Sequence, residues 1–250
     1  MTGAAFYGGG INRPLLKVLT TLNLGNRRVL SVGCGSAALE AVLQEHYYSY
    51  VVGLDYSKEA ITVAKTRIKN AFVFDLEKGS LKEILGKKRF DIILFADILE
   101  HVRCPSVLLE EVKDFLKDTG VIVVSIPNIA NWSIRLNLLG GRWDYTDVGL
   151  LDKTHIKFYT LKTAKKLITR RGYKIMSVDY STSIVNILYG KLKSIPYEKE
   201  VYPVESKLVI PKKKGILRRA ARFFIERCDR MVTYLMPGLC AYQFIIVAKK

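Results

Sequence analysis

A glycine-rich turn, Gly33-Cys34-Gly35, is the first feature of the sequence that could do chemistry. Glycine tolerates backbone angles that a Cβ forbids, and it lets the main chain approach a ligand closely. The apolar run before the turn is typical of a buried strand, and the alanine-rich stretch after it is typical of a helix. The free N–H groups at the start of that helix would point at the ligand. The turn therefore predicts a cofactor cradle.

Two acidic residues bear on which cofactor this is. The pattern Gly33-x-Gly35-x-x-Ala38 fits a dinucleotide fingerprint as well as the looser glycine loop of an S-adenosylmethionine (SAM) site. Asp55 ends the second apolar run, where a carboxylate would accept hydrogen bonds from ribose hydroxyls in either case. Asp75 ends the third run, where it would face an adenine amino group, and a pyrophosphate site has less need of it. Asp is also common in turns for conformational reasons alone.

Two histidines near expected loop ends could act as general bases. His101 follows the fourth apolar run, and His155 lies in the stretch Asp152-Lys153-Thr154-His155. An imidazole titrates near neutral pH and can take a proton from a hydroxyl, although a single histidine is more often structural. On one helical turn, Asp152 could orient the ring of His155. We expect no metal site, because no third ligand has suitable spacing.

Alternating apolar runs and helical patterns must position these residues. The repeated order of strand, crossover helix and strand predicts a parallel sheet with helices on both faces. After residue 128 the alternation stops. Residues 129–159 are rich in Asn, Gly, Trp and Tyr and too long for an ordinary connection, which predicts an active-site cover. We predict strands at 29–32, 50–54, 71–74, 90–95, 121–126, 173–180 and 242–248, and helices at 57–68, 105–116 and 160–171, with another beginning at Pro14.

The composition is that of a globular chain of 250 residues with one sizeable core. Lys and Arg number 40 against 23 Asp and Glu, and the net charge of +17 favours anionic partners unless it only solvates the surface. The four cysteines are far apart and lack a C-x-x-C pair, which indicates a reduced, cytoplasmic interior without disulfides. We expect neither a signal sequence nor a membrane span.

A basic amphipathic helix is expected inside an insertion at 183–238, between the last two strands. On a helical wheel of 216–235 the apolar residues form one arc and charged residues, among them Asp229, lie opposite. Through residues 212–235 such a helix could give a cytoplasmic protein peripheral contact with anionic membrane, although packing on the sheet is the simpler interpretation. No nucleic-acid module is recognisable. The arc consists of Leu217, Ala220, Phe224, Cys228, Met231 and Leu235.

Four motifs in order resemble the class I SAM-dependent methyltransferases, of the methyltransferase domain 23 type: VLSVGCGSA, VVGLDYS, FVFDLE and FDIILFADILEHV. The resemblance implies a single Rossmann-like α/β domain over 1–250, with a seven-stranded, mostly parallel sheet and an antiparallel last strand. It also implies SAM as the cofactor. The segment SIPNIANWSIRLNLLGGRWDYTDVGLLDKTHIKFYT is similar to a subfamily associated with surface-polysaccharide glycosyltransferases and to methyltransferase-like proteins linked to methionine biosynthesis.

The resemblance also implies roles for single residues. Asp97 would stand near the methionine end of SAM or near the acceptor. Ser31 stands where most members have an acid that helps hold the methionine end, and Ala37 replaces a third glycine. Loss of a charge-assisted hydrogen bond there would cost about 1.5–3 kcal/mol of cofactor affinity. The implied cofactor contacts are Gly33, Cys34, Gly35, Asp55, Tyr56, Asp75, Leu76 and Asp97.

These observations predict an enzyme that transfers the methyl group of SAM to a hydroxyl on a sugar or glycolipid-linked small molecule. Residues 129–159 would cover that acceptor. Two alternatives stay open at this point. One is a non-catalytic partner or regulatory protein with a degraded cofactor site, for which Ser31 is the best support. The other is an NAD-dependent enzyme.

Overall fold

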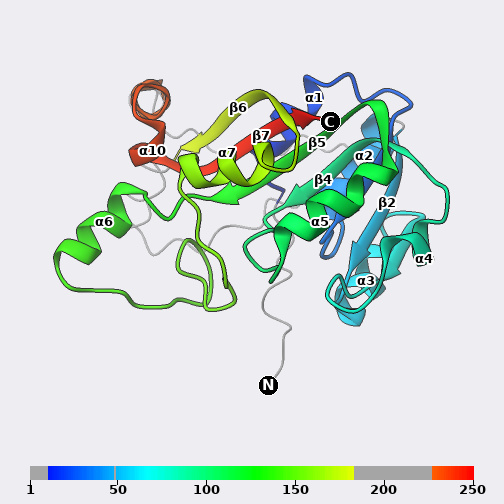
Figure 1. Cartoon of the computed structure of the whole chain (residues 1–250), viewed down its shortest axis with the longest axis horizontal. Helices are drawn as coiled ribbons and strands as arrows, with labels where there is room; N and C mark the ends of the chain where they lie inside the picture. The colour runs from blue at the N-terminus through cyan, green and yellow to red at the C-terminus, as the bar shows by residue number, and fades with distance from the viewer. Residues whose placement is uncertain (1–10, 48, 183–226) are drawn as a thin grey trace, which may run out of the picture.

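The computed structural model describes residues 11–47, 49–182 and 227–250, which form one sheet with helices packed on it (Figure 1). The strand order is β3-β2-β1-β4-β5-β7-β6. The strands β1 to β5 run parallel, and β7 is antiparallel to both β5 and β6. This confirms the predicted Rossmann-like sheet with an antiparallel last strand. The strands are β1 (Arg28–Val32), β2 (Tyr50–Asp55), β3 (Asn70–Val73), β4 (Phe90–Ala96), β5 (Leu116–Pro127), β6 (Lys174–Thr182) and β7 (Ala241–Lys249).

Each face of the sheet buries its own apolar cluster, because successive strand residues point to opposite faces. In β4, Ile93 and Phe95 belong to one cluster, whereas Ile92 and Leu94 belong to the other. Burial on both faces explains why the central strands appear in the sequence as continuous apolar runs. One cluster takes residues from α1 (Arg13–Thr20), α2 (Ala38–Tyr47) and α3 (Lys58–Ala64), and the other from α4 (Leu81–Leu85), α5 (Pro105–Glu111) and α7 (Leu161–Thr169).

Side-chain caps fix where several of these helices begin. The Oγ of Ser57 accepts a hydrogen bond from the backbone N–H of Ala60 at 3.1 Å and so caps α3. Asn12 caps α1 in the same way. Thr160 and Thr163 form a reciprocal capping box at the start of α7.

The helix predicted at 105–116 is shorter in the structure. The α-helix α5 ends at Glu111, and a 3₁₀ turn, η2 (Val112–Phe115), follows it. Leu116 already pairs with Phe90, so β5 begins five residues before the predicted strand at 121–126. The tighter 3₁₀ turn ends the helix and brings the chain into the sheet at once.

The prediction for the basic helix at 216–235 lies partly outside the described residues. Residues 227–235 are helical, but the predicted faces are wrong there. Asp229 and Thr233 are buried, whereas Met231 and Leu235 are 59% and 73% exposed. The Thr233 hydroxyl donates to Oδ1 of Asp229 at 3.4 Å, so the buried polar groups partner each other, which a helical wheel does not foresee.

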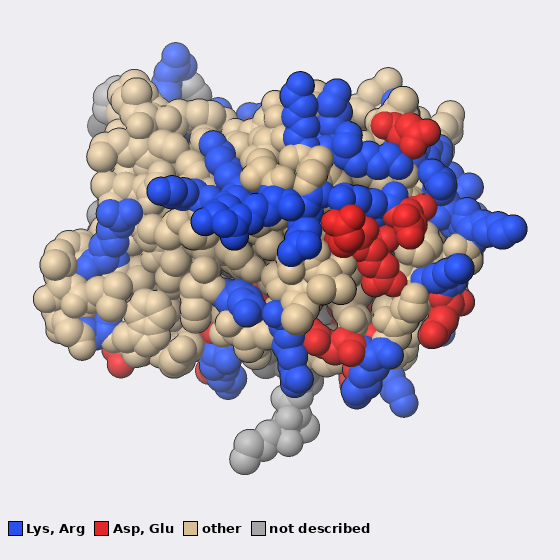
Figure 2. Space-filling model, viewed as in Figure 1, with Lys and Arg blue, Asp and Glu red and all other residues tan. Residues whose placement is uncertain are grey.

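The surface charge agrees with the excess of basic residues. Figure 2 shows Lys and Arg side chains in a band across the face that carries α5 and α7, with acidic side chains gathered beside one end of the band. Among the described residues, no helix combines the length and the apolar character that crossing a membrane requires.

Candidate active site

The glycine turn lies where the strand order reverses, between β1 and β4. Val32 pairs with Phe95, so the chain segments that follow these two strands leave the sheet side by side. Ligands of such sheets bind at the carboxyl ends of the strands at this point. Gly33 and Gly35 adopt φ angles of 76° and 53°, which favour glycine. A Cβ on Gly33 would lie 2.7 Å from Cδ1 of Ile98, so this turn packs directly on the segment after β4.

Asp55 joins the glycine turn to the helix that follows β2. Its Oδ2 accepts a 2.8 Å hydrogen bond from the backbone N–H of Gly35, and its Oδ1 accepts one of 2.9 Å from that of Ser57. Each carboxylate oxygen has two lone pairs, so each retains capacity for one further donor. Asp55 is 8% exposed, which leaves a small part of it open to a ligand.

The other predicted cofactor contacts differ in what they can offer. The Cys34 thiol packs against Gly53, because a Cβ there would come within 2.7 Å of its sulfur. Burial raises the pKa of this thiol above its usual range, so only the backbone of Cys34 is available. Tyr56 is 72% exposed and offers a free ring, whereas Leu76 packs against an apolar cluster.

Asp75 lies at the exposed rim of the sheet, after β3. Its Oδ1 accepts a hydrogen bond from the backbone N–H of Glu77 at 3.0 Å, and its Oδ2 is 3.2 Å from Nζ of Lys78. The bond from Glu77 and then the Lys78 ammonium hold the pKa of Asp75 below its ordinary value. The carboxylate is therefore charged at neutral pH and open to solvent.

A buried carboxylate stands beside Ser31, and the sequence analysis missed it. The Ser31 hydroxyl donates a 2.6 Å hydrogen bond to Oε1 of Glu40, which lies in the first turn of α2. Glu40 is 2% exposed, and its burial raises the pKa of the carboxyl to about 7. A carboxyl group from α2 is thus hydrogen-bonded to the side chain at position 31.

Asp97 is held by residues from three distant parts of the chain. Its backbone N–H donates to Oγ of Ser125 at 3.0 Å, and the Ser125 hydroxyl donates to its Oδ1 at 2.9 Å. Nε2 of Gln243 donates to the same Oδ1, and Oε1 of Gln243 accepts from Nδ2 of Asn12 at 2.9 Å. Burial raises the pKa of Asp97 against the lowering effect of these donors. No local spacing links these residues, so the sequence carried no signal for the network.

The two predicted imidazoles meet in the structure. The ring centroids of His101 and His155 are 4.8 Å apart in an edge-to-face arrangement. Nδ1 of His101 lies 3.1 Å from the carbonyl oxygen of Thr154, and Nδ1 of His155 lies 3.3 Å from that of Leu150. A carbonyl can only accept, so Nδ1 carries a proton in both rings, and the neutral form of either ring has its lone pair on Nε2. Burial lowers the pKa of His155, so this ring is neutral at pH 7.

Asp152 does not orient His155 as predicted. The segment is a turn in place of the helical turn that the prediction assumed, and Oδ1 of Asp152 accepts hydrogen bonds from the backbone N–H and the hydroxyl of Thr154 at 2.8 and 2.7 Å. The carbonyl of Leu150 holds the His155 ring instead. Asp152 therefore shapes the turn that presents His155.

Glu100 completes a cluster with the two histidines. It is 1% exposed, and within the described residues neither carboxylate oxygen has a hydrogen-bond partner. Its Oε1 lies 4.0 Å from Nε2 of His155. Burial raises the pKa of Glu100 well above its ordinary value. Its own backbone N–H lowers the pKa by a smaller amount, although the two groups do not meet the geometry of a hydrogen bond. One ligand atom each of Glu100, His101 and His155 lies within 4.8 Å of the others.

The predicted cover at 129–159 is anchored at both ends, to β7 at its start and to the turn after β4 at its end, and carries α6 (Trp132–Leu139). At its start, Nδ2 of Asn128 and Nδ2 of Asn131 donate to the carbonyl of Ala241 at 2.8 and 2.9 Å. At its end, the backbone N–H groups of Ile156 and Lys157 both donate to the carbonyl of Glu100 at 3.0 Å. These bonds bring His155 to the turn after β4. Two exposed aromatic rings of the segment, Trp143 and Tyr145, pack edge to face.

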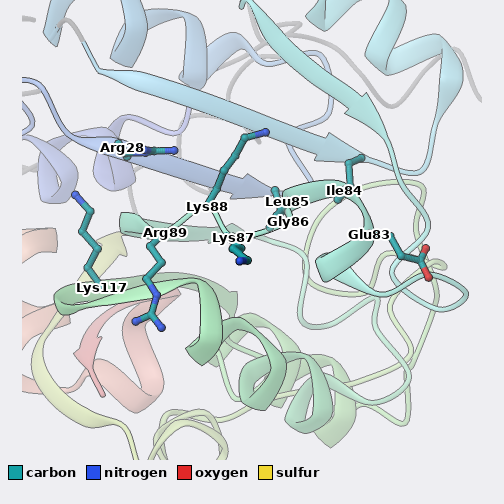
Figure 3. Close-up of a pocket in the computed structure, with 9 residues that line it drawn as sticks. All are labelled: Arg28, Glu83, Ile84, Leu85, Gly86, Lys87, Lys88, Arg89 and Lys117. Atoms are coloured by element: carbon teal, nitrogen blue, oxygen red, sulfur yellow. The ribbon is translucent and has the colours of Figure 1, made fainter.

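A cavity of about 760 Å³ lies away from all of these residues (Figure 3). Arg28 stands at the start of β1, Arg89 precedes β4 and Lys117 is the second residue of β5, so the cavity opens at the amino edge of the sheet. None of the predicted site residues lines it. Its lining consists of Arg28, Glu83, Ile84, Leu85, Gly86, Lys87, Lys88, Arg89 and Lys117.

Comparison with known proteins agrees with this architecture. The family model of a methyltransferase domain matches residues 7–178. The chain is 35% identical over 122 residues to a ubiquinone biosynthesis O-methyltransferase of Bradyrhizobium diazoefficiens, covering 48% of this chain and 47% of the relative. It is 30% identical over 173 residues to the protein of that name from Rhodopseudomonas palustris strain TIE-1, covering 68% and 66%. The chain thus spans about half to two thirds of the length of these relatives.

Among solved structures, an S-adenosylmethionine dependent methyltransferase from Mesorhizobium loti matches with a TM-score of 0.59 and 20% identity, over 98% of this chain and 100% of that one. At this identity the likeness concerns the fold, which is that of the class I SAM-dependent methyltransferases. Because the family model covers more than half of its length, the chain belongs to the methyltransferase-domain family.

Proposed function

We propose that this chain binds SAM at the glycine turn and transfers its methyl group to a hydroxyl oxygen of a small acceptor. The observation that carries the proposal is the 2.8 Å hydrogen bond from the Gly35 N–H to Asp55. It joins the main-chain cradle after β1 to the carboxylate at the end of β2, at the carboxyl edge where the strand order reverses. Membership of the methyltransferase-domain family supports the same conclusion.

The residues at this edge fit SAM in charge and in hydrogen-bonding capacity. Asp55 would accept from the ribose hydroxyls with its remaining lone pairs, and the exposed carboxylate of Asp75 would accept from the adenine amino group. The free ring of Tyr56 would lie against the adenine. Bound SAM supplies a methyl group on a positively charged sulfur. The acidic residue that is missing at position 31 would be replaced by the buried Glu40, near the methionine end of SAM.

The acceptor side would be formed by Asp97, the Glu100-His101 turn and the 129–159 segment. In the reaction the acceptor oxygen bonds to the methyl carbon, the bond from that carbon to sulfur breaks, and the hydroxyl proton leaves to solvent. Much of the rate comes from holding the two reactants in line. His155 and His101 are the groups that could assist the loss of the proton, with Asp152 holding the turn that presents His155.

We propose a sugar or glycolipid-linked acceptor within this reaction class. The support is the similarity of the 126–160 sequence described above and the exposed rings of Trp143 and Tyr145, which offer flat apolar surfaces to a sugar ring. The relatives named above are O-methyltransferases of ubiquinone biosynthesis, which supports an oxygen atom as the one that is methylated. Any assay of methyl transfer to sugar hydroxyls should therefore include a phenolic acceptor for comparison.

The non-catalytic alternative rested on Ser31. In the structure the Ser31 hydroxyl is hydrogen-bonded to the carboxyl group of Glu40, so an acidic side chain stands at this end of the cradle. We therefore favour the enzyme.

The cytoplasmic location and the peripheral membrane contact through 212–235 stay predictions, and flotation with anionic vesicles at low salt tests the contact. Recovery of the protein entirely in the vesicle-free fraction would refute it.

The decisive experiment has two stages. Isothermal titration with SAM should give one saturable site, and NAD should give none. Labelled SAM is then offered with a panel of sugars and glycolipids, and with catechols as the phenolic comparison. Transfer of label to a sugar hydroxyl is the expected result. Absence of SAM binding at millimolar concentration, with folding confirmed by circular dichroism, would overturn the proposal, and transfer to the catechols alone would overturn the acceptor class.

A further inference from the structure

The carboxylate of Glu100 is buried without a counter-charge in the described part of the chain. It is 1% exposed, and neither of its oxygens is hydrogen-bonded there. The charged groups that act on it most, Asp97 and Asp152, are themselves acidic and therefore make its ionisation harder. Burying an ionised carboxylate without partners is strongly unfavourable, so this group needs either a proton or a cation.

The two neighbouring imidazoles are already set to act as ligands. Each donates its Nδ1 proton to a backbone carbonyl, His101 to that of Thr154 and His155 to that of Leu150. Each therefore keeps the lone pair of Nε2 for another partner. Metal-ligating histidines are held in this way, with the second ring nitrogen bonded to a carbonyl or a carboxylate that fixes the tautomer and the ring orientation.

The spacing of the three groups is that of ligands around an ion. Oε1 of Glu100 lies 4.0 Å from Nε2 of His155, too far for a hydrogen bond between them. One possible ligand atom of each of the three residues, a ring nitrogen or a carboxylate oxygen, lies within 4.8 Å of those of the other two. Ligands about 2.0–2.1 Å from a tetrahedral zinc ion are roughly 3.4 Å apart, so small side-chain rotations would close the site. We propose that Glu100, His101 and His155 bind a divalent transition-metal ion.

The ligand set indicates the class of metal. Two imidazoles and one carboxylate suit Zn²⁺, Fe²⁺, Co²⁺ or Mn²⁺, whereas Mg²⁺ and Ca²⁺ prefer sites made of oxygen ligands. Three protein ligands leave at least one position open. His101 is half-buried and lies on the solvent side of the cluster, so that position is reachable from outside.

The role of the ion rests on the proposed function, whereas its binding does not. A hydroxyl of the acceptor in the open position would lose its proton to solvent more readily, because a divalent cation lowers the pKa of a bound hydroxyl group. The oxygen then bonds to the methyl carbon while the bond to sulfur breaks. A free imidazole base is not needed in this scheme, and both histidines act as ligands.

Titration with Co²⁺ tests the site directly. The full chain, stripped with a chelator and desalted, is titrated with CoCl₂ while its visible absorption is followed, and Zn²⁺ is then added as a competitor. We expect one equivalent of Co²⁺, displaced by Zn²⁺. Glu100→Gln, His101→Gln and His155→Gln should each weaken Co²⁺ binding by about 100-fold or more, beyond what loss of an outer-shell partner costs. The matched controls Glu45→Gln and His46→Gln, on the exposed end of α2, should bind as the native chain does.

The opposite result is equally clear. If the native chain binds no Co²⁺, or if the three cluster variants bind it as tightly as the controls, there is no metal site and Glu100 carries a proton instead. Circular dichroism melts show whether each variant is folded. SAM titration of the same preparations separates the two proposals: SAM binding without Co²⁺ binding overturns the metal site alone, and Co²⁺ binding without SAM binding overturns the proposed function alone.

Discussion

The hydroxyl of Ser31 in β1 donates a 2.6 Å hydrogen bond to the buried carboxyl of Glu40 in α2, so the pair joins the two elements that flank the glycine turn. Through this bond the acidic side chain of Glu40 lies beside position 31, where the strand has a serine in place of an acid. Burial moves the pKa of Glu40 from its ordinary 4.5 to about 7, so the group changes its charge in the physiological range. This property makes the pair testable without any knowledge of the acceptor.

Glu40→Gln should change the pH dependence of stability. The folded pKa is raised, so the folded state holds the proton more tightly, and the native chain loses stability as pH rises from 4.5 to 7. Relative to the Gln variant the loss should be on the order of 3 kcal/mol. Urea unfolding between pH 4.5 and 8 measures it. Glu45→Gln, on the exposed part of α2, is the control, and parallel curves for native chain and Glu40→Gln would contradict the assignment.

Asp55→Asn should weaken SAM binding more than Asp75→Asn does. Asp55 accepts from two backbone N–H groups, and an amide can accept with only one of its two terminal atoms. The loss of one charge-assisted hydrogen bond at the turn and of the bonds to the ribose should cost about 1.5–3 kcal/mol or more of binding free energy. Calorimetry at equal protein concentration compares the variants. Equal affinities would mean that SAM lies elsewhere.

Gly33→Ala should distort the cradle, because the new Cβ meets Cδ1 of Ile98 at 2.7 Å and φ is 76°. We expect a loss of stability of about 1–3 kcal/mol and a loss of SAM affinity. Gly86→Ala, where φ is 59° and the space is open, isolates the cost of the backbone angle. Adding Ile98→Ala to Gly33→Ala should restore part of the affinity, and an additive double variant would argue against the contact.

Ser125→Ala should destabilise the chain by about 1–3 kcal/mol, because it leaves the half-buried Asp97 without one of its donors and the backbone N–H of Asp97 without an acceptor. Ser181→Ala is the matched control. The Ser181 hydroxyl is buried without a hydrogen-bond partner among the described residues, so its removal should cost little or nothing. Chemical denaturation of the two variants should differ clearly. Similar losses of unfolding free energy in the two variants would show that the hydrogen bonds of Asp97 do not stabilise this part of the fold.

The sequence predicted the sheet and the cofactor half of the site because both depend on local patterns. Apolar runs mark buried strands, and Gly33, Asp55 and Asp75 each follow such a run, so their common edge is a consequence of parallel pairing. The partners of Ser31 and Asp97 were missed because they come from other elements and have no fixed spacing. Glu100 was not singled out because the fold, and not the chain order, brings its Oε1 to 4.0 Å from Nε2 of His155.

Two other differences have simple physical reasons. The helical wheel of the basic helix placed Asp229 on the solvent side. In the structure Asp229 is buried and hydrogen-bonded to the buried Thr233, and such pairing lets polar side chains lie inside, where their polarity alone would not predict them. The predicted role of Asp152 assumed a helical turn, whereas Asp152 bonds to Thr154 and ends any such turn. Asp and Thr compete with helical hydrogen bonding in this manner.

The pairing of Thr182 with Ala241 has a consequence for how this chain can diverge. The connection between β6 and β7 leaves the sheet and returns to it at neighbouring positions, so its length does not set the register of either strand. Lengthening such a connection twofold costs only about 0.6 kcal/mol in closure entropy. Related chains can therefore exchange, shorten or extend the stretch between these two residues while the cofactor edge of the sheet stays as it is. The length of this connection and the cofactor edge can therefore change independently of each other.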